Sequence, residues 1–548
     1  MEDESMKKKM KLIGAVVALT MAVSVMATGC KSSSGNGGEG GSGSANGGTL
    51  QIGVENKGYG DEWAYKLAEA FEAKTGIDTQ VVKSNSSDWT ETALLAGSKN
   101  NDIDVIFDIN NLAMKNLATA YYLDECERAY ADLSDIYDSK LEGYDTDKTL
   151  EELVFPYSLA ACTWGGEDAG YGDGKQYFVN WASGVEGLVY NKSLFDKYNL
   201  AVPKTTNEMF AVMDQMTTIS NGTYAKNEEG YTIYPFSYSG KVNYLHYPQL
   251  VWWAQYDGID TFNNGLQGKD ANGNYTAESQ KTIGKLSSFS IVSKMLDLDN
   301  KYTDPNSASY SFTDAQVMFL AEQSFMMSTG DWLEREMSTN FSESMEIAFM
   351  PIPVNSDIVA NCTTVTTVEQ LAEVVSYIDG DIQEKPSYVS DEDLAYIKSA
   401  RSMYCSEGNQ HICYIPAYSN NIEAGKQFIQ FMLSKEGQEI MLQYSYGNMA
   451  MLNLDVSQFD YYKSLSNLQQ SKLEIVQGNG GATFVGKNYV HPMTYAGGLE
   501  ICYNVMESAF GVTKDSGAHR TAKEFWEAEY SQVSSKFSTM MSQAGVKN

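Results

Sequence analysis

The feature that most constrains the fold is the order of apolar patterns between residues 50 and 109. Alternating apolar residues at 50–54 and a second stretch at 77–82 are typical of strands, and helical spacing separates them. Another helical pattern spans 88–97, and DIDVIFDI at 102–109 is so uniformly apolar that it predicts a strand covered on both faces. The order strand, helix, strand, helix, strand predicts an α/β unit built on a parallel sheet.

The boundaries of the first helix can also be predicted. Asp61 is expected to cap its N-terminus with its side chain, and Gly76 offers a C-terminal stop. Later segments repeat these elements: VEGLVYNKSLFDKYNL at 185–200 predicts a strand that runs into a helix, and residues 419–442 predict an amphipathic pair of helices. We find no internal repeat.

The N-terminus has the pattern of an export signal. Four lysines between Lys7 and Lys11 precede an almost uninterrupted apolar run at 12–25, which is too short to span a bilayer as a stable helix. We therefore predict a secretory signal peptide over residues 1–29. The acidic MEDES ahead of the lysines is unusual for a signal, so we expect translation to begin at Met6.

A lone cysteine follows this signal. The order Ala27-Thr28-Gly29-Cys30 resembles a bacterial lipobox, in which the cysteine is acylated after cleavage before it. The resemblance implies a lipid anchor on Cys30; the alternative is an ordinary secretory signal with an incidental cysteine. The Gly- and Ser-rich residues up to 48 bury nothing, so we interpret 30–48 as an anchor and a flexible tether with an end-to-end distance of somewhat over 20 Å, roughly 5–6 Å × √18.

Composition excludes several classes of partner. The formal net charge of −32 opposes binding to nucleic acid and electrostatic docking to anionic lipid. The cysteines show no spacing suited to zinc, so no metal or other cofactor is predicted. We interpret them as mostly buried thiols, with a disulfide between Cys405 and Cys413 as the alternative. Aromatic residues make up 12% of the chain, and some must offer flat apolar faces near the surface.

Four motifs in order carry a resemblance to a known family. They are GLVYNKSLFDKYNLAVPKTTNEMF at 187–210, AEQSFMMSTGDW at 321–332, MPIPV at 350–354 and IEAGKQFIQFMLSKEGQ at 422–438. Together they resemble the Tyr-Asn-Lys, Gly-x-Trp, Leu-Pro and C-terminal helix motifs of extracellular solute-binding protein family 1, the sugar-type receptor lipoproteins of ABC importers. The resemblance runs from about Thr49 to the C-terminal helices.

The resemblance implies an α/β fold of the type II, maltose-binding-protein-like class, with two hinge-linked lobes that close on a ligand. The expected N-terminal lobe comprises residues 49–183 plus 351–445, and the expected C-terminal lobe comprises 184–350 plus 446–548. The implied protein is a monomer and not an enzyme. It hands its ligand to ABC permease subunits and faces outward from the cell membrane, or into the periplasm if the host has an outer membrane.

Candidate binding residues follow from the resemblance and from the end of a strand. The resemblance nominates the following residues: Asn56, Lys57 and Tyr59 in the loop after the first strand, Trp181 in a crossing strand, Trp252 and Trp253 at an aromatic helix start, and Asp331, Trp332 and Arg335 around the Gly-x-Trp motif. Asp108 and Asn110 are added because open α/β sheets bind ligands at the carboxyl ends of their strands. The alternatives are core packing for the tryptophans, with one of the adjacent pair structural, paired or solvated roles for the charges, and an Asx turn after the strand.

These residue types suit a carbohydrate ligand. Aromatic rings pack against the C–H faces of a sugar, while carboxylate, amide and guanidinium groups bind its hydroxyls in a concave pocket. Extra length at 161–175, 263–275 and 357–405 favours an oligosaccharide over a monosaccharide. The alternatives are a non-sugar solute such as a polyamine in the same architecture, or an exported glycoside hydrolase with two catalytic carboxylates.

Overall fold

The computed structural model describes most of the chain after the tether. The described residues are 48–84, 97, 101–109, 128–166, 171–241, 244–341, 345–477, 481–487, 491–495, 506–513 and 515–546. The predicted signal peptide, Cys30, Asn110 and nearly all of the predicted helix at 88–97 lie outside them. Among the described residues, no helix is both long and apolar enough to cross a membrane.

The first sheet contains the three strands that the apolar patterns predicted. Its strands in spatial order are β2 (Thr79–Ser84), β1 (Leu50–Glu55), β3 (Val105–Ile109), β12 (His411–Tyr414) and β6 (Val179–Asn180). The first three are parallel, whereas β12 is antiparallel to both β3 and β6. Residues 105–108 are buried, as expected for a central strand with both faces covered.

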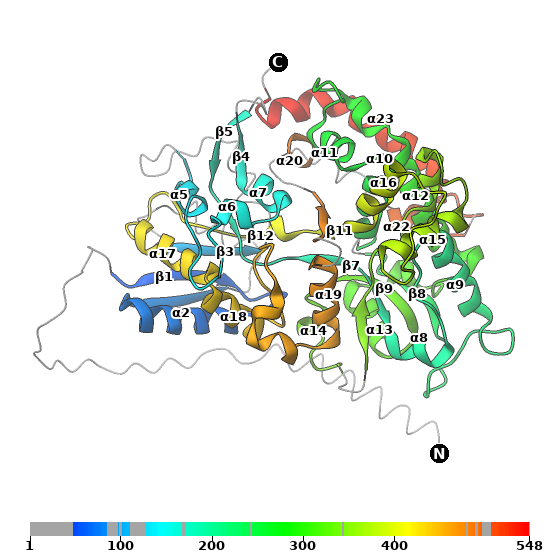
Figure 1. The fold of residues 1–548 in the computed structure, drawn as a ribbon, viewed down its shortest axis with the longest axis horizontal. Coiled ribbons are helices and arrows are strands. Elements are labelled where there is room, and N and C mark those ends of the chain that lie inside the picture. Colours follow the sequence, from blue (N-terminus) through cyan, green and yellow to red (C-terminus); the bar gives the residue numbers. More distant parts are fainter. Residues whose placement is uncertain are drawn as a thin grey trace, which may run out of the picture. The chain divides into compact units, whose positions relative to one another are not determined.

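Helices cover this sheet, and one of their predicted caps is wrong. Helix α2 (Glu62–Thr75) joins β1 to β2 and ends at Gly76, whose φ of 73° is left-handed as a C-terminal glycine requires. Asp61 makes no side-chain cap; its carboxylate instead lies 2.9 Å from the Lys83 ammonium. Helices α17 (Ile422–Leu433) and α18 (Lys435–Tyr444) lie beside α2 (Figure 1).

The second sheet lies to the right of the first sheet in Figure 1. Its strands in order are β13 (Thr483–Val485), β11 (Met403–Ser406), β7 (Val185–Asn191), β9 (Ser324–Gly330) and β8 (Tyr234–Ser237), and β10 (Ile347–Phe349) also pairs with β7. The predicted strand-to-helix turn after β7 is confirmed, because the Asn191 side chain accepts a hydrogen bond from the Leu194 N–H at 2.9 Å.

Helices α8 (Lys192–Tyr198), α9 (Thr206–Thr218), α10 (His246–Asp257), α12 (Ile283–Leu296) and α13 (Phe312–Leu320) accompany the second sheet (Figure 1). Further elements are α7 (Pro156–Cys162), α11 (Ile259–Gln267), α14 (Leu333–Glu336), α15 (Val368–Ile378), α16 (Asp391–Ser402), α19 (Asn467–Gln477), α20 (Pro492–Tyr495), α23 (Ala522–Gln543) and the hairpin of β4 (Thr163–Gly166) and β5 (Tyr171–Gln176). Three further short helices are α5 (Ser134–Tyr137), α6 (Leu150–Leu153) and α22 (Met506–Phe510).

The expected lobe boundary at residue 351 needs correction. Strand β11 belongs to the second sheet, so the chain returns to the first sheet between Ser406 and His411 rather than at the prolines of MPIPV. Residues of the segment 354–400 form a small hydrophobic core of their own, and α16 packs against α10 of the second lobe. From here, "first lobe" and "second lobe" mean the elements packed on the first and second sheet.

The cysteines carry no disulfide in the described residues. Cys405 in β11 and Cys413 in β12 are buried free thiols, as is Cys162, so the alternative of a Cys405–Cys413 disulfide is wrong. The two thiols belong to strands of different sheets.

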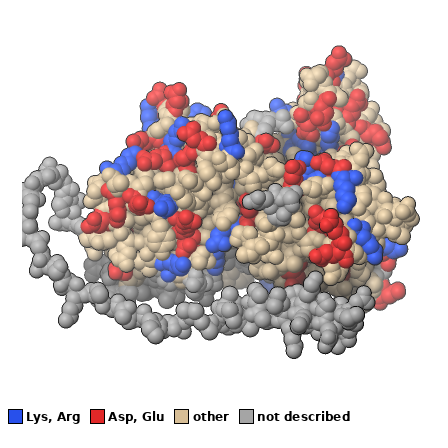
Figure 2. All heavy atoms as spheres, turned by 90° about the horizontal axis from the view of Figure 1, so that it is seen from below, with Lys and Arg blue, Asp and Glu red and all other residues tan. Residues whose placement is uncertain are grey.

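Acidic side chains are spread over the molecular surface. On the face seen in Figure 2, aspartate and glutamate are interspersed with lysine and arginine. On this face the two signs of charge alternate, as is common for an acidic protein surface.

Candidate functional site

Two short segments cross between the sheets and lie against each other. One joins β6 to β7 through Gly184, and the other joins β11 to β12 through Gly408. Gly184 has a φ of +50°, and a Cβ added to it would lie 2.7 Å from the Gly408 nitrogen. The Glu407 N–H also donates to the Gly184 carbonyl at 2.9 Å. Glycine is required at position 184 both for its conformation and for this close approach.

The loop after β1 reaches the second lobe at Asp331. The Tyr59 hydroxyl donates to one oxygen of the Asp331 carboxylate, and Ser183 and Lys472 donate to the other, each at 3.2 Å. The Asp331 and Lys472 side chains have no exposed surface. Burial makes the charged lysine costly and lowers the pKa of Lys472, although the nearby Asp331 carboxylate opposes that shift. Asp331 therefore links the two lobes through protein partners. This agrees with the alternative that its charge is paired within the protein instead of binding a ligand.

Trp332 lies where three segments meet. It lies two residues after the end of β9, and its indole packs over Gly330, where a Cβ would lie 2.4 Å from the ring. A Cβ at Gly58, in the loop after β1, would lie 3.7 Å from the Trp332 Cβ. The ring centroid of Trp332 is 6.3 Å from that of His411 at the start of β12. The Trp332 side chain thus lies at the junction of both lobes and retains 9% exposure.

Two tyrosines at the start of α10 complete an aromatic group around Trp332. The ring centroids of Tyr244 and Tyr247 lie 6.1 and 6.5 Å from that of Trp332, and the two tyrosines stack on each other at 5.5 Å. Sequence reasoning missed both, although their spacing of three residues around a helix start places them on one face.

The predicted roles of Trp252 and Trp253 are corrected. Both are fully buried within the second lobe, where the Trp252 indole N–H donates to the Pro353 carbonyl at 3.0 Å and that of Trp253 donates to Asp257 at 2.7 Å. They lie more than one helical turn beyond Tyr247. Residues 246–255 of α10 are all buried, so the helix has no single covered face that would tell which aromatic residue faces the junction.

A buried charge network borders the aromatic group. Glu407 in the crossing segment lies 3.1 Å from His246 Nε2 and 3.8 Å from Lys487 Nζ. Burial favours the neutral carboxyl, but Lys487 and His246 together outweigh it and lower the pKa of Glu407. Burial, and then the charges of Glu407 and Asp331, raise the pKa of Glu186 well above its ordinary value. These surroundings therefore favour the protonated form of Glu186 and the ionised form of Glu407.

The other predicted residues have protein partners. Lys57 pairs with the buried Glu55 at 3.0 Å, and Asn56 is half-buried in the same loop. Asp108 is buried, accepts a hydrogen bond from the Tyr414 hydroxyl at 3.3 Å and receives the Trp181 indole N–H on its carbonyl at 3.0 Å.

Trp181 contacts Tyr59, and Arg335 lies beside the next residue in the loop, Gly60. Trp181 is buried in the first lobe, stacked on Trp63 with centroids 4.7 Å apart, and its edge meets Tyr59 at 5.8 Å. Arg335 is in the second lobe, and a Cβ at Gly60 would lie 2.8 Å from its Nε. The structure thus brings Tyr59, Asp331, Trp332 and Arg335 together, and places Trp181 behind them in the core.

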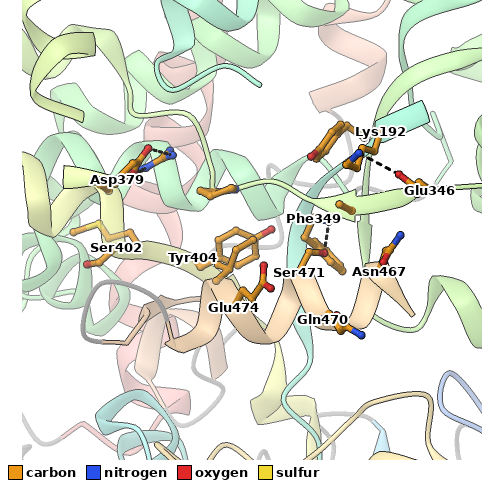
Figure 3. A pocket seen from close by; sticks show the side chains of 16 residues that line it. Lys192, Glu346, Phe349, Asp379, Ser402, Tyr404, Asn467, Gln470, Ser471 and Glu474 are labelled. Atoms are coloured by element: carbon orange, nitrogen blue, oxygen red, sulfur yellow. Dashed lines mark hydrogen bonds and ion pairs between the residues drawn. The ribbon is translucent and has the colours of Figure 1, made fainter. Parts of the chain in front are cut away.

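A pocket of about 580 Å³ lies elsewhere, on the second lobe between α19 and β10 (Figure 3). Its charged groups largely satisfy one another: Lys192 lies 3.1 Å from Glu346, and Arg401 lies 2.7 Å from Asp379. Tyr404 on its floor is buried. Internally paired charges and covered rings leave this pocket with less to offer a ligand than the lobe junction. No three His, Cys, Asp or Glu side chains in the described part of the chain are grouped so that they could hold a metal ion.

The comparisons with known proteins decide the family. The model of the bacterial extracellular solute-binding proteins matches residues 66–470. The chain belongs to this family. No curated protein sequence matches it.

Solved structures of solute-binding proteins share the fold at low sequence identity. An ABC substrate-binding protein from Listeria monocytogenes in complex with cycloalternan has 13% identity and a TM-score of 0.53, over 91% of this chain and 99% of that one. The bacterial solute receptor AcbH, described as exclusive for β-D-galactopyranose, has 12% identity and a TM-score of 0.55, over 89% and 98%. The raffinose complex of RafE has 14% identity and a TM-score of 0.50, over 89% and 100%. The two-lobe α/β fold of a solute-binding protein is confirmed.

Proposed function

We propose that this solute-binding protein captures a carbohydrate between its lobes and delivers it to the permease of an ABC importer. An oligosaccharide is the first candidate. The observation that carries the proposal is the aromatic group of Trp332, Tyr244 and Tyr247 at the lobe junction, beside the polar side chains of His246 and Glu407.

This combination matches the two faces of a sugar ring. The apolar C–H face packs on an aromatic ring, while hydroxyls accept from a histidine or lysine and donate to a carboxylate. Trp332 and the half-buried Tyr244 keep exposed surface for such contact. Lobe closure would then remove the sugar from water and strengthen each hydrogen bond.

The structural relatives support the same ligand class. The titles of three solved structures with this fold name cycloalternan, β-D-galactopyranose and raffinose, which are all carbohydrates. The shared fold is compatible with this role, and the aromatic junction gives it a physical basis in this chain.

The proposal includes an anchor at the cell membrane. Acylation of Cys30 would hold the protein there, facing outward, and the Gly- and Ser-rich tether up to residue 48 would let the lobes turn toward a permease.

A polyamine is a weaker candidate on the described charges. Such a ligand needs carboxylates that are free to pair with its amines, whereas Asp331 and Glu407 already lie beside Lys472 and Lys487. A glycoside hydrolase would need two carboxylates flanking a scissile bond, one with a raised pKa. Both alternatives are outcomes of the experiment below.

The test is a titration of the soluble chain from Thr49, followed by tryptophan fluorescence. Plant and host oligosaccharides of two to six units are the probes, with monosaccharides and spermidine as controls, and chromatography checks that the glycan is not consumed. A saturable change with one glycan series supports the proposal. A response to spermidine alone would instead support a polyamine receptor, and shortened glycans would instead support a glycoside hydrolase.

The variant Trp332→Ala tests the site itself by calorimetry with the best glycan. Affinity is expected to fall about 30-fold or more, equivalent to about 2 kcal/mol for a central aromatic contact. Tyr231→Ala serves as the control, because this tyrosine is 54% exposed and belongs to none of the junction contacts. Equal affinity in parent and Trp332→Ala would remove Trp332 from the site.

A further inference from the structure

A second cavity is lined by residues of both lobes. Two of the helices that bound it, α7 and α11, lie on the other side of the crossing segments from α14 in Figure 1. The cavity has a volume of about 400 Å³ and is bounded by α7 of the first lobe and by α11 and β13 of the second. This volume falls in the lower part of the range for small-molecule sites, about 300–1,000 Å³. None of its lining residues belongs to the group around Trp332.

One wall of this cavity is aromatic and held in place. The rings of Phe155 and Phe484 meet edge to face with centroids 4.9 Å apart, and Tyr157 lies 6.4 Å from Phe484. The Tyr157 hydroxyl donates to the Ser406 carbonyl at 2.8 Å, which ties this wall to the crossing segment. The rings therefore form a preorganised apolar surface rather than a mobile one.

Another part of the wall carries amides. Asn263 and Gln267 lie four residues apart on α11, on one face of the helix, and Asn453 approaches from the first-lobe side. Their side-chain amides make no hydrogen bond with any other described residue. An amide offers both a donor and an acceptor, so three of them present paired hydrogen-bonding groups to the cavity.

The described part of the cavity wall carries no formal charge. Among its described lining residues there is no Asp, Glu, Lys or Arg, although the chain has a net charge of −32. Its one imidazole belongs to His491, whose pKa is lowered to about 4 by burial and, to a smaller extent, by Lys269. A charged ligand would lose its hydration here without gaining a counter-charge.

From these observations we propose that the cavity is a second binding site, which takes a small neutral polyhydroxy compound of about one sugar ring. The rings of Phe155 and Phe484 would pack on its C–H face, and Asn263, Gln267 and Asn453 would bind its hydroxyls. The site is separate from the junction at Trp332 and does not depend on which solute binds there.

Occupancy of this cavity would be linked to the junction at Trp332. The walls come from both lobes, so their separation depends on how the lobes are arranged. The structure forms the cavity while Tyr59 and Asp331 are in contact across the lobes. A ligand that bridges the walls stabilises that arrangement, and it changes affinity at Trp332 by the same factor by which a ligand at Trp332 changes affinity in the cavity.

The test is calorimetry of the chain from Thr49 with D-glucose, D-galactose and D-xylose as probes at millimolar concentration. The test compares the parent with the double variant Asn263→Leu/Gln267→Leu and with the single variant Trp332→Ala. Asn264→Leu is the matched control, because Asn264 is on the same helix but does not line the cavity. If the double variant fails to fold, Asn453→Leu tests the same wall from an exposed position.

The expected result is that at least one probe binds, that binding persists in Trp332→Ala and Asn264→Leu, and that the cavity variant weakens it at least tenfold. Failure of all three probes to bind, or binding that the cavity variant leaves unchanged, would overturn the second site. Loss of probe binding in Trp332→Ala alone would assign the probe to the junction and also overturn it. Failure of every oligosaccharide at Trp332 would instead refute the proposed function and leave this result intact.

Discussion

Replacement of Lys472 by methionine is expected to lower the free energy of unfolding by about 3–5 kcal/mol, because it leaves the buried Asp331 carboxylate without its counter-charge. The Lys472 ammonium lies 3.2 Å from Asp331, and neither side chain has exposed surface. The same ammonium donates to the Gly447 carbonyl at 2.8 Å, which would lose its partner as well. Methionine fills the space of the lysine stem, so most of the loss is electrostatic.

The measurement is urea unfolding of the chain from Thr49 at pH 7, followed by circular dichroism. The single variants Lys472→Met and Asp331→Asn are compared with the double variant. The double variant should lose less than the sum of the singles, by about 0.5–3 kcal/mol, because removal of both charges leaves neither buried alone. Lys140→Met is the control, since its pair with Asp147 is 60% and 101% exposed, and such pairs contribute about 0–1 kcal/mol. A Lys472→Met variant within about 1 kcal/mol of the parent, or an additive double variant, would refute this reasoning.

Three further predictions concern stability. Burial raises the pKa of Glu507 to about 8, so the native carboxyl keeps a proton that the unfolded chain releases above about 4.3, and stability falls as pH rises between these values. Glu507→Gln should therefore raise the melting temperature more at pH 8 than at pH 5, and equal shifts would contradict the assignment. Asp393 accepts hydrogen bonds from the backbone N–H groups of 363–365; burial opposes its charge, but these bonds and that of Thr364 outweigh it and lower its pKa to about 2. The contribution of Asp393 to stability is present above about pH 3.9 and is lost as pH falls toward 2. Asp393→Ala should therefore lower the free energy of unfolding in urea by about 2–3 kcal/mol at pH 7 and by less at pH 3. An equal loss at both pH values would contradict this assignment. Gly184→Ala should lower the free energy of unfolding by about 2 kcal/mol or more, because Gly184 has a positive φ and the new Cβ would meet Gly408. Gly222 also has a positive φ but has open space around it, so the control Gly222→Ala should cost only about 1 kcal/mol. Equal melting temperatures of the two variants would argue against the close approach of Gly184 to Gly408.

Elements with a clear local period were predictable from the sequence. The alternation at 50–54 and the apolar run at 102–109 gave the right strands, because these residues are covered in the first sheet as their pattern requires. The Gly76 stop was right for the same local reason. Asp61 was wrong as a cap because a tertiary partner, Lys83, takes its carboxylate.

The site was only partly predictable, because its decisive contacts join residues that are far apart in the chain. Asp331 and Lys472 are 141 positions apart, and no local pattern pairs them. The aromatic start of α10 was recognised, but its orientation depends on how the helix packs, so Tyr244 and Tyr247 were missed in favour of Trp252 and Trp253. The return of the chain to the first sheet was placed too early because β11 is short and follows an inserted pair of helices.

The contact between Gly184 and Gly408 also limits how the lobes can move. The Ser406 hydroxyl donates to the Ser183 carbonyl at 2.8 Å and the Glu407 N–H donates to Gly184, so the two crossing segments cannot slide past each other and must bend as a pair. Paired in this way, the two segments form a hinge. They allow one lobe to rotate relative to the other about a single axis, and they resist translation of one sheet along the other. Binding and release of a solute held between the lobes would then use the same rotation, in the closing and the opening direction.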